Sequence, residues 1–139
     1  MDCYQTKRLP TAGIVAICSR DATHHHLRLF DIRAGRNALK ATHTVELEQS
    51  SDERRAEVIR PSFSPDGILL ALPRSDKATH IYDARYMSTA RGPIAQLRHG
   101  LPRTQSPLHY GVVAAEWIYH QFGHPGLGLV TGGHDGASL

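Results

Sequence analysis

The sequence predicts an all-β fold, and three observations support this class. Short runs of β-branched or alternating apolar residues recur along the 139-residue chain, turn-forming residues separate them, and no segment of ten or more residues follows the helical period. Residues 56–85 show the pattern most clearly, because three such runs alternate there with two turn signals. A three-stranded meander leaves apolar faces uncovered, so we expect it to pack against further sheets.

The first turn of this meander is the segment Ser-Pro-Asp-Gly at residues 64–67. Proline presets φ for a type I turn, and glycine accepts the left-handed conformation that follows it. We therefore expect three antiparallel strands, over residues 58–63, 68–72 and 79–82.

The remaining runs complete the strand prediction. Residues 13–18 form a continuous apolar run typical of a strand buried on both faces, residues 27–32 alternate, and residues 38–47 indicate a more exposed strand. Residues 48–55 are polar with five charges, which favours a solvated loop. Three further strands are expected later in the chain: an outer strand over residues 94–98, a buried strand over residues 112–119 and a strand over residues 127–131.

Two of the predicted strands end alike, one in Phe-Asp-Ile-Arg and the other in Tyr-Asp-Ala-Arg, and an aspartate lies in the turn before each strand. A third turn of this kind lies in Thr-Gly-Gly-His-Asp-Gly-Ala-Ser-Leu, residues 131–139. With the Ser-Pro-Asp-Gly turn, these motifs resemble the blades of WD-repeat (WD40-type) β-propellers, in which four antiparallel strands form each blade. The repeat positions are Asp21, Phe30, Asp31, Asp76, Tyr82, Asp83 and Asp135.

The resemblance covers roughly residues 13–139 and implies a partial propeller whose ring is not closed. Residues 1–12 would form an N-terminal tail. Three units would follow, namely a partial blade at 13–47, a full blade at 56–98 and a truncated blade at 110–139. About two and a half blades would make the chain a segment of a longer protein or a truncated gene product.

The resemblance also assigns structural roles to three residues of the last unit. In the family, a histidine before the inner strand bonds the turn aspartate of the same blade, and His109 and Asp135 occupy these places. Trp117 would lie on the inner strand. The middle unit offers Asp76 but no obvious histidine at the matching place, which is a departure from the family pattern.

Composition disfavours several classes of protein. The net charge is +3, from 16 basic and 13 acidic residues spread along the chain, whereas nucleic-acid binders cluster their basic residues. Cys3 and Cys18 have no spacing that indicates a disulfide framework. No run approaches the roughly 20 apolar residues that cross a bilayer, and we find no signal peptide. We expect a soluble protein of the cytoplasm or nucleus.

Candidate sites for chemistry are few, and we expect no catalytic, cofactor or metal site. His24, His25 and His26 could attract a metal, but side chains on an extended chain alternate between its two faces, so at most two could share one ion. Glu116 is either a buried acid or, as we favour, a residue that faces the central channel of a propeller. The glycines near residue 130 complete no phosphate-binding motif.

The resemblance implies a non-enzymatic scaffold whose blade rims and loops bind protein partners or the remaining blades of a longer propeller. Arginine and lysine residues at turns and strand ends could form an exposed rim, which would suit an acidic peptide. One alternative is a metal-dependent or hydrolytic enzyme that uses His24–His26 or Glu116, and another is nucleic-acid binding through the same cations. The candidate rim residues are Arg74, Lys77, Arg85, Arg91, Arg98 and Arg103.

Overall fold

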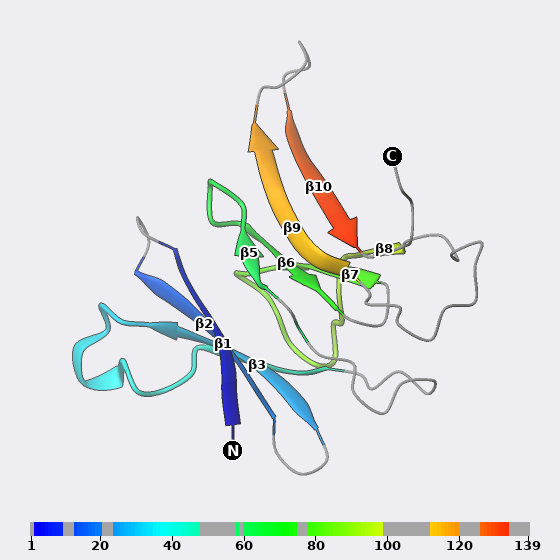
Figure 1. Ribbon diagram of the computed structural model, residues 1–139. Helices are drawn as coiled ribbons and strands as arrows, with labels where there is room; N and C mark the ends of the chain where they lie inside the picture. Colours follow the sequence, from blue (N-terminus) through cyan, green and yellow to red (C-terminus); the bar gives the residue numbers. More distant parts are fainter. Residues whose placement is uncertain are drawn as a thin grey trace.

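Three antiparallel sheets make up the part of the protein that the computed structural model describes (Figure 1). Two of the sheets have four strands each and the third has two. Within this part, no helix is long and apolar enough to cross a membrane. The described residues are 2–9, 13–20, 24–47, 58, 60–74, 78–98, 112–119 and 126–133.

The first sheet contains β1 (Asp2–Leu9), β2 (Ile14–Arg20), β3 (His25–Asp31) and β4 (His43–Leu47), in that spatial order. Our assignment of residues 1–12 to a tail is therefore wrong for the part that forms β1. This strand pairs with β2 along the whole length of β2, which completes a four-stranded unit where we expected a partial one. The predicted strand at 38–47 starts later, because the short 3₁₀ helix η1 (Gly35–Asn37) and a turn come before β4.

The second sheet contains β5 (Ser62–Phe63), β6 (Leu69–Pro73), β7 (Ala78–Asp83) and β8 (Ala95–Arg98). The meander predicted from the sequence is present, and the fourth strand pairs with β7 at the outer edge. The first strand is shorter than predicted. Ahead of it, an isolated bridge joins Val58 to Arg74, the residue that follows β6.

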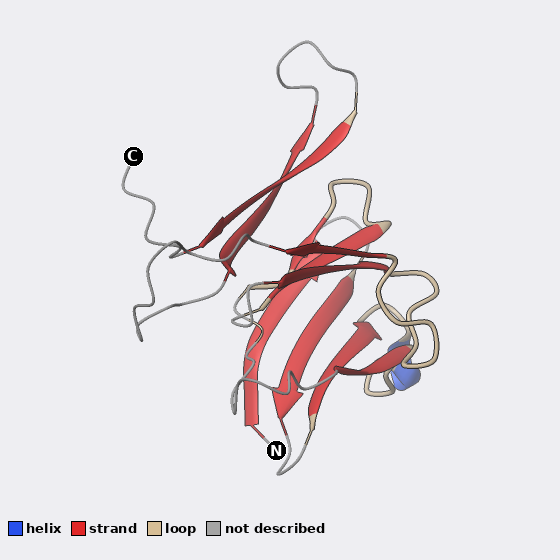
Figure 2. Ribbon diagram, turned by 90° about the vertical axis from the view of Figure 1, so that its right-hand side faces the viewer, coloured by secondary structure: helices blue, strands red, loops and turns tan. Residues whose placement is uncertain are grey.

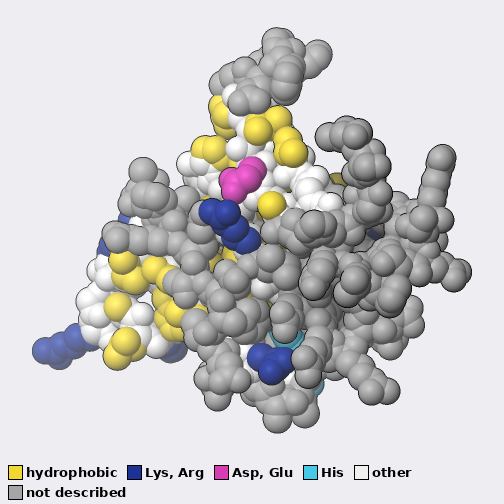
Figure 3. Space-filling model, in the orientation of Figure 1, with side chains coloured by type: hydrophobic (Ala, Val, Ile, Leu, Met, Phe, Trp, Pro, Cys, Tyr) yellow, Lys and Arg dark blue, Asp and Glu magenta, His cyan; other side chains and the backbone are white. Residues whose placement is uncertain are grey.

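The third sheet is the hairpin of β9 (Val112–Tyr119) and β10 (Leu127–Gly133), which projects away from the other two sheets in Figures 1 and 2. Strand β9 lies against β5, β6 and β7 of the second sheet. We expected residues 112–119 to be buried, but β9 carries exposed side chains as well as the buried Ala115. Apolar side chains lie at the surface around β9 and β10 (Figure 3), among them Tyr119 and Val130.

One apolar core is shared by the two four-stranded sheets. Burial follows the strand period, because alternate residues of β3 point inward and the intervening residues are only half-buried. Cys18 lies in this core as a small buried side chain, in the apolar run predicted at residues 13–18. The largest fully buried apolar side chains are Leu27, Leu29, Val45, Leu70 and Leu72.

Candidate interaction surface

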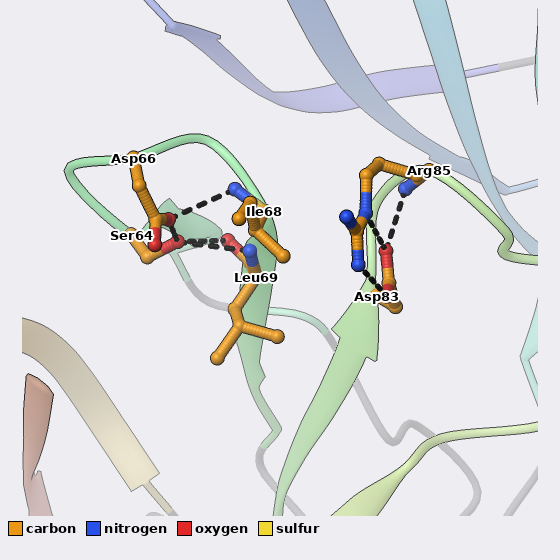
Figure 4. Close-up of polar contacts among 6 residues, drawn as sticks. All are labelled: Ser64, Asp66, Ile68, Leu69, Asp83 and Arg85. Carbon is orange, nitrogen blue, oxygen red and sulfur yellow. Dashed lines mark hydrogen bonds and ion pairs between the residues drawn. The ribbon is translucent and has the colours of Figure 1, made fainter.

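The Ser-Pro-Asp-Gly turn has the predicted conformation, and its side chains hold it closed. Gly67 has φ +74° and donates its N–H to the Ser64 carbonyl at 2.9 Å. Asp66 Oδ1 accepts the Ser64 hydroxyl at 2.6 Å and the Ile68 N–H at 3.0 Å, and Ser64 Oγ accepts the Leu69 N–H at 2.8 Å (Figure 4). The Ser64 hydroxyl, followed by the Ile68 N–H, lowers the pKa of Asp66. The turn therefore fixes the start of β6.

An aspartate and an arginine two residues later form the same contact at the ends of β3 and β7. We call this contact the Asp–X–Arg clasp. In the first sheet, Asp31 Oδ1 accepts the backbone N–H of Arg33 at 3.0 Å and its Nε–H at 2.9 Å, while Oδ2 accepts Nη2–H at 3.0 Å. In the second sheet, Asp83 and Arg85 repeat these bonds at 3.0, 3.0 and 2.7 Å (Figure 4).

The clasp explains why an aspartate recurs at these two repeat positions. Side-chain hydrogen bonds from the arginine are the main cause that lowers the pKa of Asp31 and of Asp83, and the same bonds raise the pKa of Arg33 and Arg85. A carboxylate that accepts a guanidinium fork and a backbone N–H is better stabilised than one in water. The clasp thereby fixes the direction in which the chain leaves each strand.

The two loops that follow the clasps begin and end on the same backbone hydrogen bonds, offset by 52 residues, although only the first of these two described loops contains the 3₁₀ helix η1. The backbone carbonyl of Asp31 accepts the N–H of Ala34 at 3.1 Å, and the backbone carbonyl of Asp83 accepts that of Tyr86 at 3.1 Å. Each loop ends on another matched bond, because Thr42 N–H donates to Leu29 and Ile94 N–H donates to Ile81, both at 2.8 Å. Because the two loops have the same length and the same ends, their residues can be paired by position in the sequence. We call them the first loop (residues 31–42) and the second loop (residues 83–94).

The exposed side chains of the two loops differ. At one pair of positions the first loop has Ala34 where the second has Tyr86, which is 57% exposed. At another pair Leu39 corresponds to Arg91. The guanidinium carbons of Arg85 and Arg91 lie 5.3 and 5.6 Å from the centre of the Tyr86 ring, within the range of a cation–π contact. We call Arg85, Tyr86 and Arg91 the arginine–tyrosine stack.

The structure places only some of the predicted rim residues on the surface. Arg85, Arg91 and Arg98 are exposed. We expected Arg74 on the rim, and this was wrong, because Arg74 is only 3% exposed and its backbone forms a bridge with Val58. Lys77 and Arg103 lie outside the described residues.

The other repeat positions have structural surroundings where they are described. Tyr82 is buried in the shared core, and Phe30, its counterpart on β3, is half-buried. Trp117 is on β9 and donates its Nε1–H to the Ser62 carbonyl on β5 at 2.9 Å, so it joins the second and third sheets. Four positions lie outside the described residues, namely Asp21, Asp76, His109 and Asp135.

Two contacts between the first and second sheets were not apparent from the sequence. Thr89 in the second loop accepts the backbone N–H of Glu46 on β4 at 2.9 Å. Met87, two residues earlier, is buried in the shared core, whereas its counterpart in the first loop is the exposed Gly35. The sequence signal for the buried Met87 is the difference between methionine and glycine at matched positions, which is visible once the two loops are aligned.

The histidine cluster has the alternation expected of an extended chain. His25 is buried, while His24 and His26 have their rings 6.3 Å apart, and His24 Nε2 is 3.2 Å from Glu46 Oε1. Among the described residues, no group of three histidine, cysteine or acidic side chains could hold a metal ion. Glu116 is exposed on β9, so the interpretation as a buried acid is wrong.

The sheets are those of propeller blades, and solved structures show the same fold. The Dos1 propeller has a TM-score of 0.69 at 21% identity, and the match covers 96% of this chain and 29% of that one. Raptor from Chaetomium thermophilum has a TM-score of 0.55 at 14% identity, and the match covers 80% of this chain and 8% of that one. For Hsv2 from Kluyveromyces lactis (0.54, 15%), the shares are 94% of this chain and 46% of that one.

These likenesses show that the described sheets form part of a β-propeller and do not close a ring. The chain spans less than half the length of each of these propeller proteins. No protein-family model matches the sequence, and no curated protein matches it.

Proposed function

We propose that this chain is a segment of a WD-repeat propeller that acts as a non-enzymatic scaffold in the cytoplasm or nucleus. Its rims and loops would bind a protein partner, or the remaining blades of a longer propeller. Two features support the WD-repeat assignment: successive sheets carry the same aromatic-Asp-X-Arg ending, and the Ser-Pro-Asp-Gly turn begins β6.

The observation that carries the scaffold function is the matched pair of loops. Both use the same clasp and the same loop-closing bonds, yet they present different exposed side chains. The first loop exposes Leu39 and the second exposes Tyr86 between two arginines. Aromatic and arginine side chains dominate the binding energy of many protein interfaces. Loops with fixed ends and different exposed side chains are what a binding scaffold requires.

A site-specific photo-crosslinking experiment tests this function. A photoreactive phenylalanine analogue is placed at position 86 and, as a control, at position 39 of the matched loop. We expect position 86 to capture a partner that position 39 does not. The purified partner should then bind the Tyr86→Ala variant about tenfold more weakly than the wild type, and should bind Leu39→Ala with wild-type affinity. Equal capture at both positions, or equal affinity for both variants, contradicts the proposal.

The enzyme alternative is decided by a separate measurement on tag-free protein. One metal ion per chain, with hydrolytic turnover that His24→Ala abolishes, would replace the scaffold function. Nucleic-acid binding is decided by salt, because affinity for a strand that contacts several phosphates falls steeply with salt concentration. A flat response excludes it.

A further inference from the structure

We infer that the arginine–tyrosine stack is a binding site for an acidic peptide segment in which an Asp or Glu is followed by an apolar residue. This inference rests on the scaffold function proposed above and names the chemistry of the partner. It starts from the comparison of the two loops, which shows which side chains the bonds at the loop ends do not need.

The clasp and the closing bond of the loop form without the stack. The first loop begins and ends on the same hydrogen bonds with Ala34 and Leu39 at the positions of Tyr86 and Arg91. The bonds that anchor the two ends of the loop therefore give no reason for an exposed tyrosine or for a second arginine beside it. A tyrosine that is 57% exposed leaves most of its surface in water, so its own packing does not account for it either.

The charges of the stack leave one arginine available. The carboxylate of Asp83 uses both oxygens on Arg85, and Asp66 also interacts favourably with that guanidinium. Arg91 bonds Ser88 through its backbone N–H, and within the described residues its guanidinium lies against the Tyr86 ring. The positive charge of Arg91 helps to lower the pKa of Asp83, but the Asp83 carboxylate accepts its hydrogen bonds from Arg85.

A carboxylate is the ligand that fits this arrangement. A guanidinium presents a planar fork of donors that matches the two oxygens of Asp or Glu, and stacking on the ring holds the fork in one orientation. Ile94, three residues further along the chain and directly before β8, is 62% exposed and offers an apolar contact in the same loop as the charge. One available arginine beside an apolar side chain suits a peptide better than a nucleic acid, which needs several phosphate contacts.

Selection of random peptides from a displayed library tests the inference. The bait is the full chain in three forms: wild type, Arg91→Leu and Arg36→Leu. Arg91→Leu installs the residue of the first loop, so the fold should be retained, and circular dichroism verifies this. Arg36→Leu removes the same charge from the exposed surface of the first loop and serves as the matched control.

We expect the wild type and Arg36→Leu to enrich peptides with Asp or Glu before an apolar residue, and Arg91→Leu to lose this enrichment. A synthetic peptide of the enriched type should bind Arg91→Leu about tenfold more weakly, and its Glu→Gln analogue should weaken wild-type binding similarly. Three results overturn the inference: no enrichment, enriched peptides without acidic residues, or equal binding to wild type and Arg91→Leu. The scaffold function is decided independently by the crosslinking experiment.

Discussion

Replacing Met87 with alanine should uncouple the first sheet from the second. Met87 is 4% exposed and belongs to the core that both sheets share, although it lies in a loop. The truncation removes three buried heavy atoms at about 0.8 kcal/mol each, and the cavity left behind raises the expected loss to about 2–5 kcal/mol. In repeat architectures such interface energy also determines whether neighbouring units unfold together.

The assay is chemical denaturation followed by two signals. Far-ultraviolet circular dichroism reports all sheets, whereas the fluorescence of Trp117, the only tryptophan of the chain, reports the junction of the second and third sheets. In Met87→Ala the circular dichroism midpoint should fall below the fluorescence midpoint, because the first sheet loses part of its support.

The matched control is Leu39→Ala in the first loop. Leu39 is 94% exposed, so its loss should change the free energy of unfolding by less than about 0.5 kcal/mol. If Met87→Ala costs less than about 1 kcal/mol and the two midpoints still coincide, the second loop does not couple the sheets and the reasoning is refuted.

Three further predictions concern the clasp and the sheet junctions. The carboxylates of the two clasps have lowered pKa values, so their stabilisation is complete above the unfolded value of 3.8 and is lost as pH falls through the folded value. Melting temperatures of Asp83→Asn should therefore approach those of the wild type below pH 3.8, and parallel curves contradict this. Trp117→Phe removes the bond to Ser62 and should cost about 0.5–1.5 kcal/mol by denaturation, whereas no loss means that the bond does not join the sheets. Gly13→Ala should lower the free energy of unfolding more than Gly35→Ala. Both glycines have positive φ, but only a Cβ at Gly13 would lie 2.8 Å from the side-chain carbons of Arg33. If the larger loss at Gly13 persists in an Arg33→Ala background, the contact with Arg33 is not its cause.

The strand pattern of the chain could be predicted from sequence because it depends on local chemistry. The Ser-Pro-Asp-Gly turn is encoded by the conformational preferences of four adjacent residues, and the structure has the predicted φ at Gly67. The aromatic-Asp strand endings could likewise be predicted as a repeat, because each is a short motif of adjacent residues. Strand β1 was missed because Asp2–Leu9 mixes polar and apolar residues without a clear alternation, and its partner β2 supplies the pairing.

The surface could not be predicted to the same degree, because exposure depends on contacts between residues far apart in sequence. Arg74 and Arg91 both lie near turns, yet one is buried beside Val58 and the other is at the surface. The burial of Met87 likewise depends on the core that both sheets share, whose members include Val45 and Leu47, some 40 residues earlier. Nothing in the residues next to Met87 encodes this core.

The second loop shows how one segment can serve two purposes. The clasp and the closing bonds fix the two ends of both loops, and neither bond uses the side chain of Tyr86 or of its counterpart Ala34. In the second loop Met87 points into the core and fastens the neighbouring sheet, while Tyr86, the residue before it, is exposed. Adjacent residues thus divide assembly and recognition between them, so that Tyr86 can be changed without loosening the joint that Met87 makes. This separation is what makes Tyr86→Ala and Met87→Ala a decisive pair: the first should alter binding alone, and the second should alter stability.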